Sequence, residues 1–354
     1  MFPPLFHRIG RNFEIVAHPA PRVPRWVEFA QLLLSLRWPR SSWYREWRRR
    51  MEKTPAAYRR LTLACERALG AVEVPYDAIM YFGAFQSPAR RIDKPLYLFT
   101  DSCRWLSSRN PHDTVSHFRD ESERQEWLHM EGQLYRDAER LFVGSEFVRR
   151  GMIEGYAVPP EKIVTCGFGG GDDFGQPYVK TFDGRSILYI GKGDFERKGG
   201  PILLEAFRLV RREIPGATLH VVGQDRLPSG DGVISHGFIA DRRRLVDLMR
   251  RAHVFALPSL VDRNPMSVLD AMAAATPCVT SDYGAMPELL ANAGLVAPCG
   301  DVRATAGCLI QLLQDRDLAH TMGEAGHRRY LEVYNWDAVW ERIASSIDLP
   351  RGSA

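Results

Sequence analysis

The stretch SLVDRNPMSVLDAMAAATPCVTSDYGAMPE, from Ser259 to Glu288, holds two carboxylates eight positions apart, Asp262 and Asp270. At about 3.6 residues per turn, a helix that begins near Pro265 and Met266 carries Asp270 in its second turn and leaves Asp262 on the preceding loop. The start of such a helix offers free N–H groups and a partial positive charge. The stretch therefore predicts a site for a ligand that combines an anionic group with hydroxyls, as a nucleotide sugar does.

Length and composition are those of an ordinary globular protein with room for two domains. The chain has 354 residues, 45% hydrophobic and 25% charged. Its six cysteines form no CxxC pair or metal-ligand spacing, which favours reduced thiols and disfavours a zinc site. No apolar run approaches the ~20 residues of a membrane span, and the start MFPPLFHRIGRNFE lacks the apolar region of a signal peptide. We therefore expect a cytoplasmic protein.

The second half of the chain alternates strand and helix patterns. Apolar runs at 186–191, 217–223 and 233–238 predict strands, and between them Leu203, Ala206, Phe207 and Val210 follow the spacing of one helix face. This alternation predicts an α/β fold with a doubly wound parallel sheet. We expect one Rossmann-like domain over 179–335 and another over 1–178, with a C-terminal helix at 336–350 that packs back on the first domain.

A basic, glycine-rich loop, GKGDFERKGG from Gly191 to Gly200, follows the first strand of that second domain. Glycines let the backbone approach a ligand closely, and Lys192 and Lys198 supply two mobile positive charges at the carboxyl end of a strand. Taken alone, such a loop is as typical of a solvated turn as it is of a ligand site. In register with two carboxylates about seventy residues later, it predicts a diphosphate site.

These motifs resemble those of the retaining family 4 glycosyltransferases of the GT-B fold. The two carboxylates match the family's E-x7-E motif with aspartate at both ends, and the loop matches its G-R…K-G diphosphate grip with Lys192 in place of arginine. Further matches are His236-Gly237, Leu257-Pro258-Ser259 and Tyr334-x-Trp336. The resemblance covers 182–344 and is loose over 1–165. It implies two Rossmann-like domains that face a central cleft; either the N-terminal one is reduced, or its opening strand, loop and helix lie upstream of Met1.

The resemblance also implies an activity and a set of site residues. Members move a hexose from a nucleoside diphosphate sugar to a glycan or lipid-linked acceptor, with retention of configuration and without a metal or other cofactor. Lys192 and Lys198 would stabilise the leaving diphosphate, Asp262 would hold sugar hydroxyls, and Asp270 would accept from the ribose. The other residues expected to bind the donor are Gly191, Arg197, Gly223, His236, Gly237, Asn264, Pro265, Met266 and Ser267.

Small residues at two places in the sequence predict features of the backbone. Ala275 and Ala285 stand where the resembled family usually has glycine, so we expect negative φ at both. The run Gly169-Gly170-Gly171 follows the last expected strand of the first half, and it predicts a hinge near the domain boundary.

The first half predicts a nucleotide-type α/β domain without its usual opening. Strands are expected at 13–17, 78–82, 95–100 and 141–145, and a helix at 56–69, but the initial strand, Gly-rich turn and helix are missing. Asp101 directly follows the apolar run at 95–100. Because carboxyl ends of parallel strands line ligand sites, Asp101 is a catalytic candidate, and capping of the next loop is an equally good interpretation.

The N-terminal region is basic and aromatic. Residues 1–60 hold thirteen Lys and Arg against four Glu, and 37–53 interleave Trp38, Trp43, Tyr44 and Trp47 with arginines. Three interpretations stay open: a solvated helix face, a peripheral contact with an anionic membrane through 37–53, and nucleic-acid binding. The last has no recognisable nucleic-acid module to support it, so we expect no nucleic-acid partner.

Two further hypotheses stand beside the transferase. A catalytically weak GT-B protein that binds a nucleotide sugar, or serves as an accessory subunit, would explain the missing opening and the two aspartates. A GT-B epimerase is the third. The intact basic loop favours the transferase, because a pure scaffold has little use for two aligned lysines.

Overall fold

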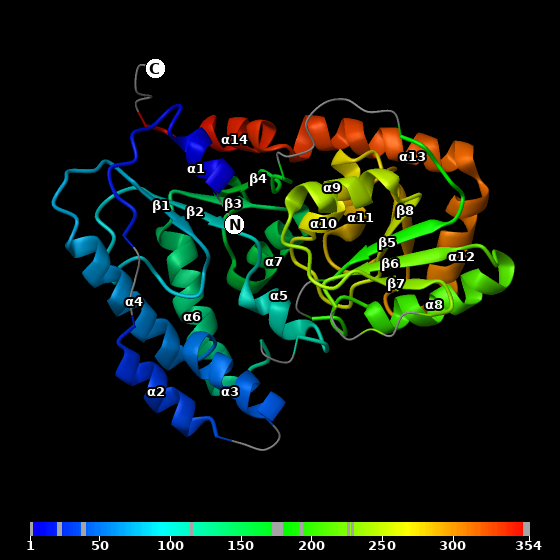
Figure 1. The fold of residues 1–354 in the computed structure, drawn as a ribbon. Helices are drawn as coiled ribbons and strands as arrows, with labels where there is room; N and C mark the ends of the chain where they lie inside the picture. Colours follow the sequence, from blue (N-terminus) through cyan, green and yellow to red (C-terminus); the bar gives the residue numbers. More distant parts are fainter. Residues whose placement is uncertain are drawn as a thin grey trace. The chain divides into compact units, whose positions relative to one another are not determined.

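The structure, a computed structural model, describes residues 3–19, 23–36, 40–113, 116–171, 180–191, 194–224, 227 and 230–349. Its contacts divide the chain into two compact units (Figure 1). The first comprises residues 1–166 with 340–354, and the second comprises 167–339. The division therefore falls earlier than residue 178, and the returning C-terminal segment begins at Trp340 inside the expected helix.

The first unit is built on a parallel sheet in the order β1-β2-β3-β4. Its strands are β1 (Ile79–Phe82), β2 (Leu96–Thr100), β3 (Arg140–Val143) and β4 (Ile163–Thr165). Its helices are α1 (Pro3–Ile9), α2 (Arg25–Leu34), α3 (Arg40–Glu52), α4 (Pro55–Gly70), α5 (Arg104–Arg109), α6 (Glu121–Asp137) and α7 (Glu146–Tyr156), with a 3-10 turn at Pro160–Lys162. Three expected strands and the expected α4 are thus confirmed.

The expected strand at 13–17 is wrong, because this segment has no strand conformation. Its residues Glu14 to Ala17 instead line a cavity of about 420 Å³ together with Met80 and Phe82 of β1. Since β1 pairs only with β2 among the described strands, β1 is the edge of this four-stranded sheet. Among the described strands, β1 and β4 are thus the two edges of the sheet in the first unit.

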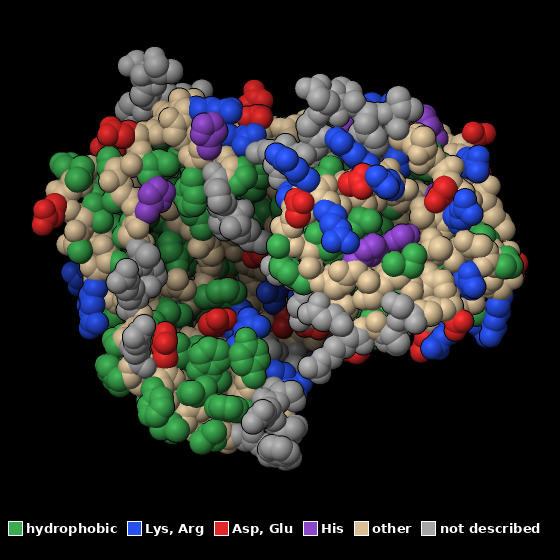
Figure 2. All heavy atoms as spheres, viewed as in Figure 1, with side chains coloured by type: hydrophobic (Ala, Val, Ile, Leu, Met, Phe, Trp, Pro, Cys, Tyr) green, Lys and Arg blue, Asp and Glu red, His purple; other side chains and the backbone are tan. Residues whose placement is uncertain are grey.

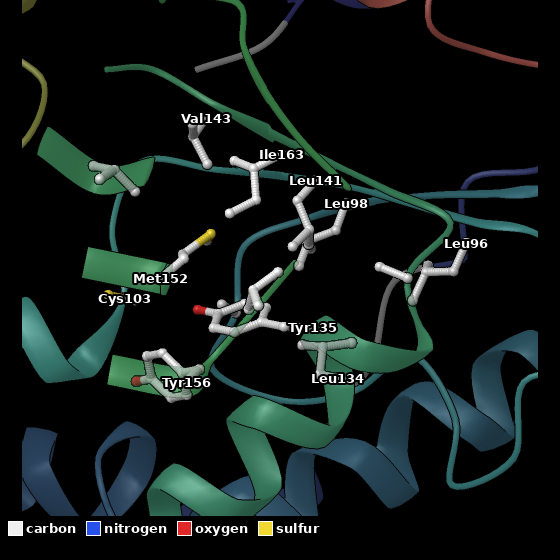
Figure 3. Packing of buried hydrophobic residues seen from close by; sticks show 14 residues of the cluster. Leu96, Leu98, Cys103, Leu134, Tyr135, Leu141, Val143, Met152, Tyr156 and Ile163 are labelled. Atoms are coloured by element: carbon white, nitrogen blue, oxygen red, sulfur yellow. The ribbon is translucent and has the colours of Figure 1, made fainter. Parts of the chain in front are cut away.

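The core of the first unit lies between its sheet and helices α6 and α7 (Figure 3). Leu98 of β2 and Leu141 of β3 are fully buried, and Tyr135 and Met152 reach the same cluster from the two helices. β2 is buried along its whole length, as its continuous apolar run predicts.

The second unit has a six-stranded parallel sheet in the order β10-β9-β8-β5-β6-β7. Its strands are β5 (Ser186–Ile190), β6 (Thr218–Val222), β7 (Val233–Ser235), β8 (Val254–Leu257), β9 (Cys278–Ser281) and β10 (Gly294–Ala297). Its helices are α8 (Gly200–Glu213), α9 (Arg242–Arg251), α10 (Met266–Ala273), α11 (Met286–Leu290), α12 (Val302–Gln314) and α13 (Arg316–Arg329). A π-helical turn at Tyr330–Tyr334 leads to α14 (Trp336–Ala344), which ends in the first unit. The predicted doubly wound α/β fold is confirmed.

The glycine run at the start of the second unit is packed rather than open. A Cβ at Gly169 would lie 2.1 Å from the Trp336 ring, and one at Gly170 would lie 2.6 Å from the Tyr330 ring. The Gly170 N–H also donates to the Tyr334 carbonyl at 2.9 Å. These glycines are thus required for close approach of backbone and rings, and the hinge stays a prediction.

The negative φ expected at Ala275 and Ala285 is found at one of these two residues. Ala285 has a φ of −86°, as expected. Ala275 has a φ of 47°, so the expectation of negative φ there is wrong. The reason is the turn after α10, where the Thr276 N–H donates to the Ala271 carbonyl at 2.9 Å and the chain reverses into β9.

A second alanine in left-handed conformation gives a stability prediction. Ala157 ends α7 with φ 51° and ψ 39°, and its N–H donates to the Ile153 carbonyl at 3.0 Å. Glycine has no Cβ penalty there, so Ala157→Gly should raise the free energy of unfolding by about 0.5–1 kcal/mol. Denaturant unfolding measures this. Ala71→Gly is the matched control: Ala71 is also an exposed helix end but has a φ of −88°, so glycine should not stabilise it.

No described helix is both long and apolar enough to cross a membrane.

Candidate functional site

The site lies where the strand order of the second unit reverses. From β5 the chain continues to β6 and β7 on one side, and it then returns to β8 on the other side. In open α/β sheets, ligands bind at such a switch point, beyond the carboxyl ends of the central strands. The loops after β5 and β8 carry the basic glycine-rich loop and the first carboxylate, so the two predicted motifs meet at this edge.

Lys198 and Asp262 form an ion pair at this edge. The Lys198 Nζ lies 2.9 Å from the Asp262 Oδ2, and the two side chains are only 18% and 8% exposed. At this burial the charges are weakly screened, so each holds the other in place. The sequence predicted that both residues would contact a ligand, but it did not predict that they contact each other.

Backbone contacts fix the two loops together. The Arg197 guanidinium donates to the Val261 carbonyl at 2.8 Å, and the Leu260 N–H donates to the Arg197 carbonyl at 2.9 Å. Gly199 has a φ of 72°, and a Cβ there would lie 1.8 Å from the Pro258 carbonyl oxygen. Only glycine fits this crossing, which sets the position of Lys198 beside it.

α10 begins as expected and presents polar groups at its start. Met266 is the first helical residue and Pro265 occupies the N-cap position, one residue before the place expected for it. The Asn264 Nδ2 and the Ser267 Oγ are buried and have no hydrogen-bond partner among the described residues. Buried polar atoms are nearly always paired, so both atoms are candidates for contact with a ligand.

Asp270 is 6% exposed and is held by a forked ion pair. The Arg242 Nη1 and Nη2 donate to its Oδ2 and Oδ1 at 2.7 and 2.6 Å, and the Gly171 N–H donates to Oδ1 at 3.1 Å. Sequence reasoning missed Arg242. It recognised Asp241 as the cap of α9, which is confirmed by the Arg243 N–H donating to it at 2.9 Å, but nothing local distinguishes Arg242 from the two arginines after it.

The turns after β6 and β7 lie at the same edge of the sheet. The Gly223 N–H donates to the Gly237 carbonyl at 2.8 Å, and the Gln224 side chain donates to the Gly191 carbonyl at 3.0 Å. The rings of His220 and His236 stack with centroids 5.3 Å apart, and their Nδ1 and Nε2 atoms are 3.0 Å apart. Burial, and then the nearby Arg244, lower the pKa of His236.

Two predicted catalytic residues cannot be assigned to this cluster, one because it is not described and one because it belongs to the other unit. Lys192 lies outside the described residues. Asp101 follows β2 as expected, but it belongs to the first unit, whereas all the residues of the cluster belong to the second. Among the residues that the structure describes, no three His, Cys, Asp or Glu side chains are grouped so that they could hold a metal ion.

Comparison with known proteins identifies the class of this fold. A sucrose-phosphate synthase from Thermosynechococcus elongatus superposes with a TM-score of 0.60 at 20% identity, over 83% of this chain and 78% of that one. Such structures are GT-B glycosyltransferases, so the chain has a GT-B fold, as predicted. Residues 184–315 match the family described as glycosyl transferases group 1. This match is confined to the second unit.

The curated relatives match over part of their length. A phosphatidyl-myo-inositol mannosyltransferase of Mycobacterium leprae is 32% identical over 171 residues, 45% of each chain. An MMP alpha-(1->4)-mannosyltransferase of Mycolicibacterium hassiacum is 28% identical over 229 residues, 60% of this chain and 54% of that one. The chain thus spans about half the length of the curated relatives it matches.

Proposed function

We propose that this chain is a retaining glycosyltransferase that moves a hexose from a nucleoside diphosphate sugar to a glycan or lipid-linked acceptor without a bound metal. The observation that carries the proposal is the grouping of Lys198, Asp262 and the start of α10 at the switch point of the second sheet. A cation, a carboxylate and unpaired polar atoms of Asn264 and Ser267 match the diphosphate and the hydroxyls of such a donor.

The proposed reaction is the one that the resemblance to the retaining family implies. The acceptor hydroxyl oxygen forms a bond to the sugar C1, and the bond from C1 to the diphosphate oxygen breaks with its electron pair. The acceptor proton passes to the leaving phosphate on the same face, so configuration is retained. Lys198 and Lys192 would stabilise the charge that develops on the diphosphate, which is the part a metal ion otherwise plays.

The acceptor class is supported by what the relatives act on. The M. leprae relative is named for phosphatidyl-myo-inositol, a lipid, and the M. hassiacum relative for MMP. A lipid-linked or glycan acceptor fits both this pattern and the basic, aromatic N-terminal region. We propose a cytoplasmic protein that contacts anionic membrane peripherally.

A specific observation favours the alternative of a binding or accessory subunit. Both Asp270 oxygens already accept hydrogen bonds from Arg242 and Gly171, although the proposed transferase needs Asp270 for the ribose. Each carboxylate oxygen has a second lone pair, so a ribose hydroxyl can still donate to Oδ2. Formation of a glycosylated product by the purified chain separates the two functions.

Ligand-dependent stabilisation is the first test. UDP, GDP, dTDP, ADP and their common sugar conjugates are each added at increasing concentration while thermal unfolding is followed. A ligand that binds only the folded state at a hundred times its Kd stabilises it by about 2.7 kcal/mol, so one nucleotide should raise the Tm clearly. Absence of a shift with every nucleotide would contradict both the transferase and the nucleotide-sugar-binding alternative.

A further inference from the structure

α2 exposes large apolar side chains at the surface of the first unit, although its sequence RWVEFAQLLL also contains Arg25, Glu28 and Gln31. Val27 and Ser35 face inward and are 7% and 0% exposed. On the opposite side, Trp26, Phe29 and Leu33 follow the spacing of one helix face and are 72%, 61% and 49% exposed. Leu34, which lies beside Val27 on the helix, and Leu36, two residues past the end of α2, are also exposed, at 61% and 60%. We call these five residues the α2 face.

A surface helix of a globular protein normally turns its polar residues to solvent. Figure 2 shows the hydrophobic side chains gathered over α2 on the surface of the first unit. Single exposed apolar side chains are ordinary, but a contiguous group of large ones marks an interaction surface.

The aromatic residues of α3, by contrast, are largely engaged inside the first unit. Trp43 is half-buried and its Nε1 donates to the Leu32 carbonyl of α2 at 3.0 Å. Trp47 is also half-buried, and Arg49 pairs with Glu123. Tyr44 of α3 is 58% exposed, but most of the exposed apolar side chains in this region belong to α2 and Leu36, upstream of the segment 37–53.

The charge around the α2 face is positive. Residues 23–53 contain eight Arg and Lys against three Glu, a balance of 8 − 3 = +5. In α3, which is tied to α2 through Trp43, Arg45 and Arg48 are exposed; Arg48 pairs with the exposed Glu52 at 3.7 Å, a pair that solvent screens. An apolar face of Trp, Phe and Leu beside exposed arginines fits the boundary between lipid headgroups and acyl chains.

The size of the α2 face disfavours a second copy of the chain as its occupant. α2 has ten residues, and at 1.5 Å per residue it is about 15 Å long. A stable protein interface buries about 800 Å² and some 20–30 residues on each partner. Five side chains on one short helix do not reach that size, whereas insertion into a bilayer requires only a few side chains with cations beside them.

We propose that the α2 face inserts into the headgroup boundary of an anionic lipid bilayer, with Arg45 and Arg48 contacting the lipid phosphates. This docking deepens the proposed function, because it would bring the chain to a lipid-linked acceptor. It does not depend on sugar transfer, since binding to vesicles is measured without donor or acceptor.

The test is flotation of the full chain with vesicles of phosphatidylcholine alone and of phosphatidylcholine mixed with phosphatidylglycerol. We expect binding to the anionic vesicles, weakened at least about tenfold by molar salt because exposed charges are then screened. The variant Trp26→Ser/Phe29→Ser/Leu33→Ser should lose at least about tenfold in binding, and Arg45→Gln/Arg48→Gln should weaken binding to anionic vesicles alone. Val74→Ser/Leu331→Ser is the control, because these two apolar residues are comparably exposed at 52% and 51% but lie outside the α2 face.

Unchanged vesicle binding in the α2 variant, or equal binding to neutral and anionic vesicles, would overturn the proposal. So would a wild-type dimer that the α2 variant loses, without vesicle binding, because a second copy would then cover this face. The nucleotide-dependent Tm shift is measured on the same variant. If the shift is retained while vesicle binding is lost, docking and donor binding are separate, and each can fail without the other.

Discussion

Replacing Lys198 by alanine should lower kcat for sugar transfer by about 10²–10³-fold, the loss seen when one preorganised group is removed from a developing negative charge. Lys198 is 18% exposed and lies 2.9 Å from Asp262, so it is fixed before a donor arrives. When the charge of Lys198 is removed, the leaving diphosphate loses a cation of the loop after β5. Steady-state kinetics with the nucleotide sugar named by the thermal panel measures the effect, and kcat should fall more than KM rises.

The same change has a structural cost that must be separated from the catalytic one. Without Lys198, the Asp262 carboxylate, 8% exposed, keeps its charge in a buried position without a partner. Lys198→Arg restores the charge without the same geometry, and it should recover stability more fully than activity. Arg208→Ala removes an exposed cation of the neighbouring helix α8 and should leave both properties unchanged. Full activity in folded Lys198→Ala would contradict the assigned role.

Local sequence patterns predicted the elements that carry the site. The start of α10 follows from a proline and a polar residue before an apolar run, and Asp270 lies in its second turn as the spacing requires. The basic loop and the first carboxylate follow strands, and the order of strands brings two such loops to one edge. These are statements about neighbours in sequence plus one topological rule, which is why they could be made without a structure.

The pairings within the site could not be predicted in this way. Lys198 and Asp262 are 64 positions apart, and Arg242 and Asp270 are 28 apart, so their contact depends on how several loops pack. Three successive arginines open α9, and only the packing of α9 beside α10 selects the first of them as the partner of Asp270. Sequence assigns such residues a type and an approximate place, but it does not assign their partners.

The sequence pattern also did not predict which side chains of α2 and α3 are exposed. The interleaved Trp and Arg at 37–53 drew attention to α3, yet Trp43 turns inward to Leu32 of α2. Most of the exposed aromatic and aliphatic side chains belong to α2, where Trp26, Phe29 and Leu33 face solvent. Which apolar side chains of a surface helix are buried is decided by tertiary packing, and no count of residue types contains that information.

Replacing Glu131 by alanine should lower the free energy of unfolding by about 3–5 kcal/mol, because several buried donors would lose their acceptor together. Glu131 is 1% exposed at the centre of α6. Its carboxyl accepts from the Trp127 Nε1 and the Tyr135 hydroxyl, both at 2.8 Å, and from the Tyr156 hydroxyl. The Arg104 N–H at the start of α5 also donates to it, at 3.2 Å. One carboxyl thus connects α5, α6 and α7.

A loss of that size is a large part of the stability of a typical domain, so Glu131→Ala should unfold at much lower urea concentration or fail to accumulate. Gln133→Ala, an exposed change on the same helix, should shift the free energy of unfolding by less than about 0.5 kcal/mol. Glu131→Gln keeps the shape but directs an amide N–H₂ at groups that only donate, including the Trp127 indole, so it should lie between the two.

The pH dependence of unfolding separates the effect of titration of the Glu131 carboxyl from the effect of the side chain's shape, which Glu131→Gln keeps. Burial raises the pKa of Glu131 in the folded state, against the opposing effect of its hydrogen-bond donors. The folded protein then holds this proton to higher pH than the unfolded chain, whose pKa is about 4.3. The stability that protonated Glu131 contributes is complete below that pH and declines as pH rises toward the folded pKa. Wild type should therefore lose stability relative to Glu131→Gln across this window in urea titrations. A difference that is constant with pH would show that Glu131 does not titrate differently in the folded and unfolded states.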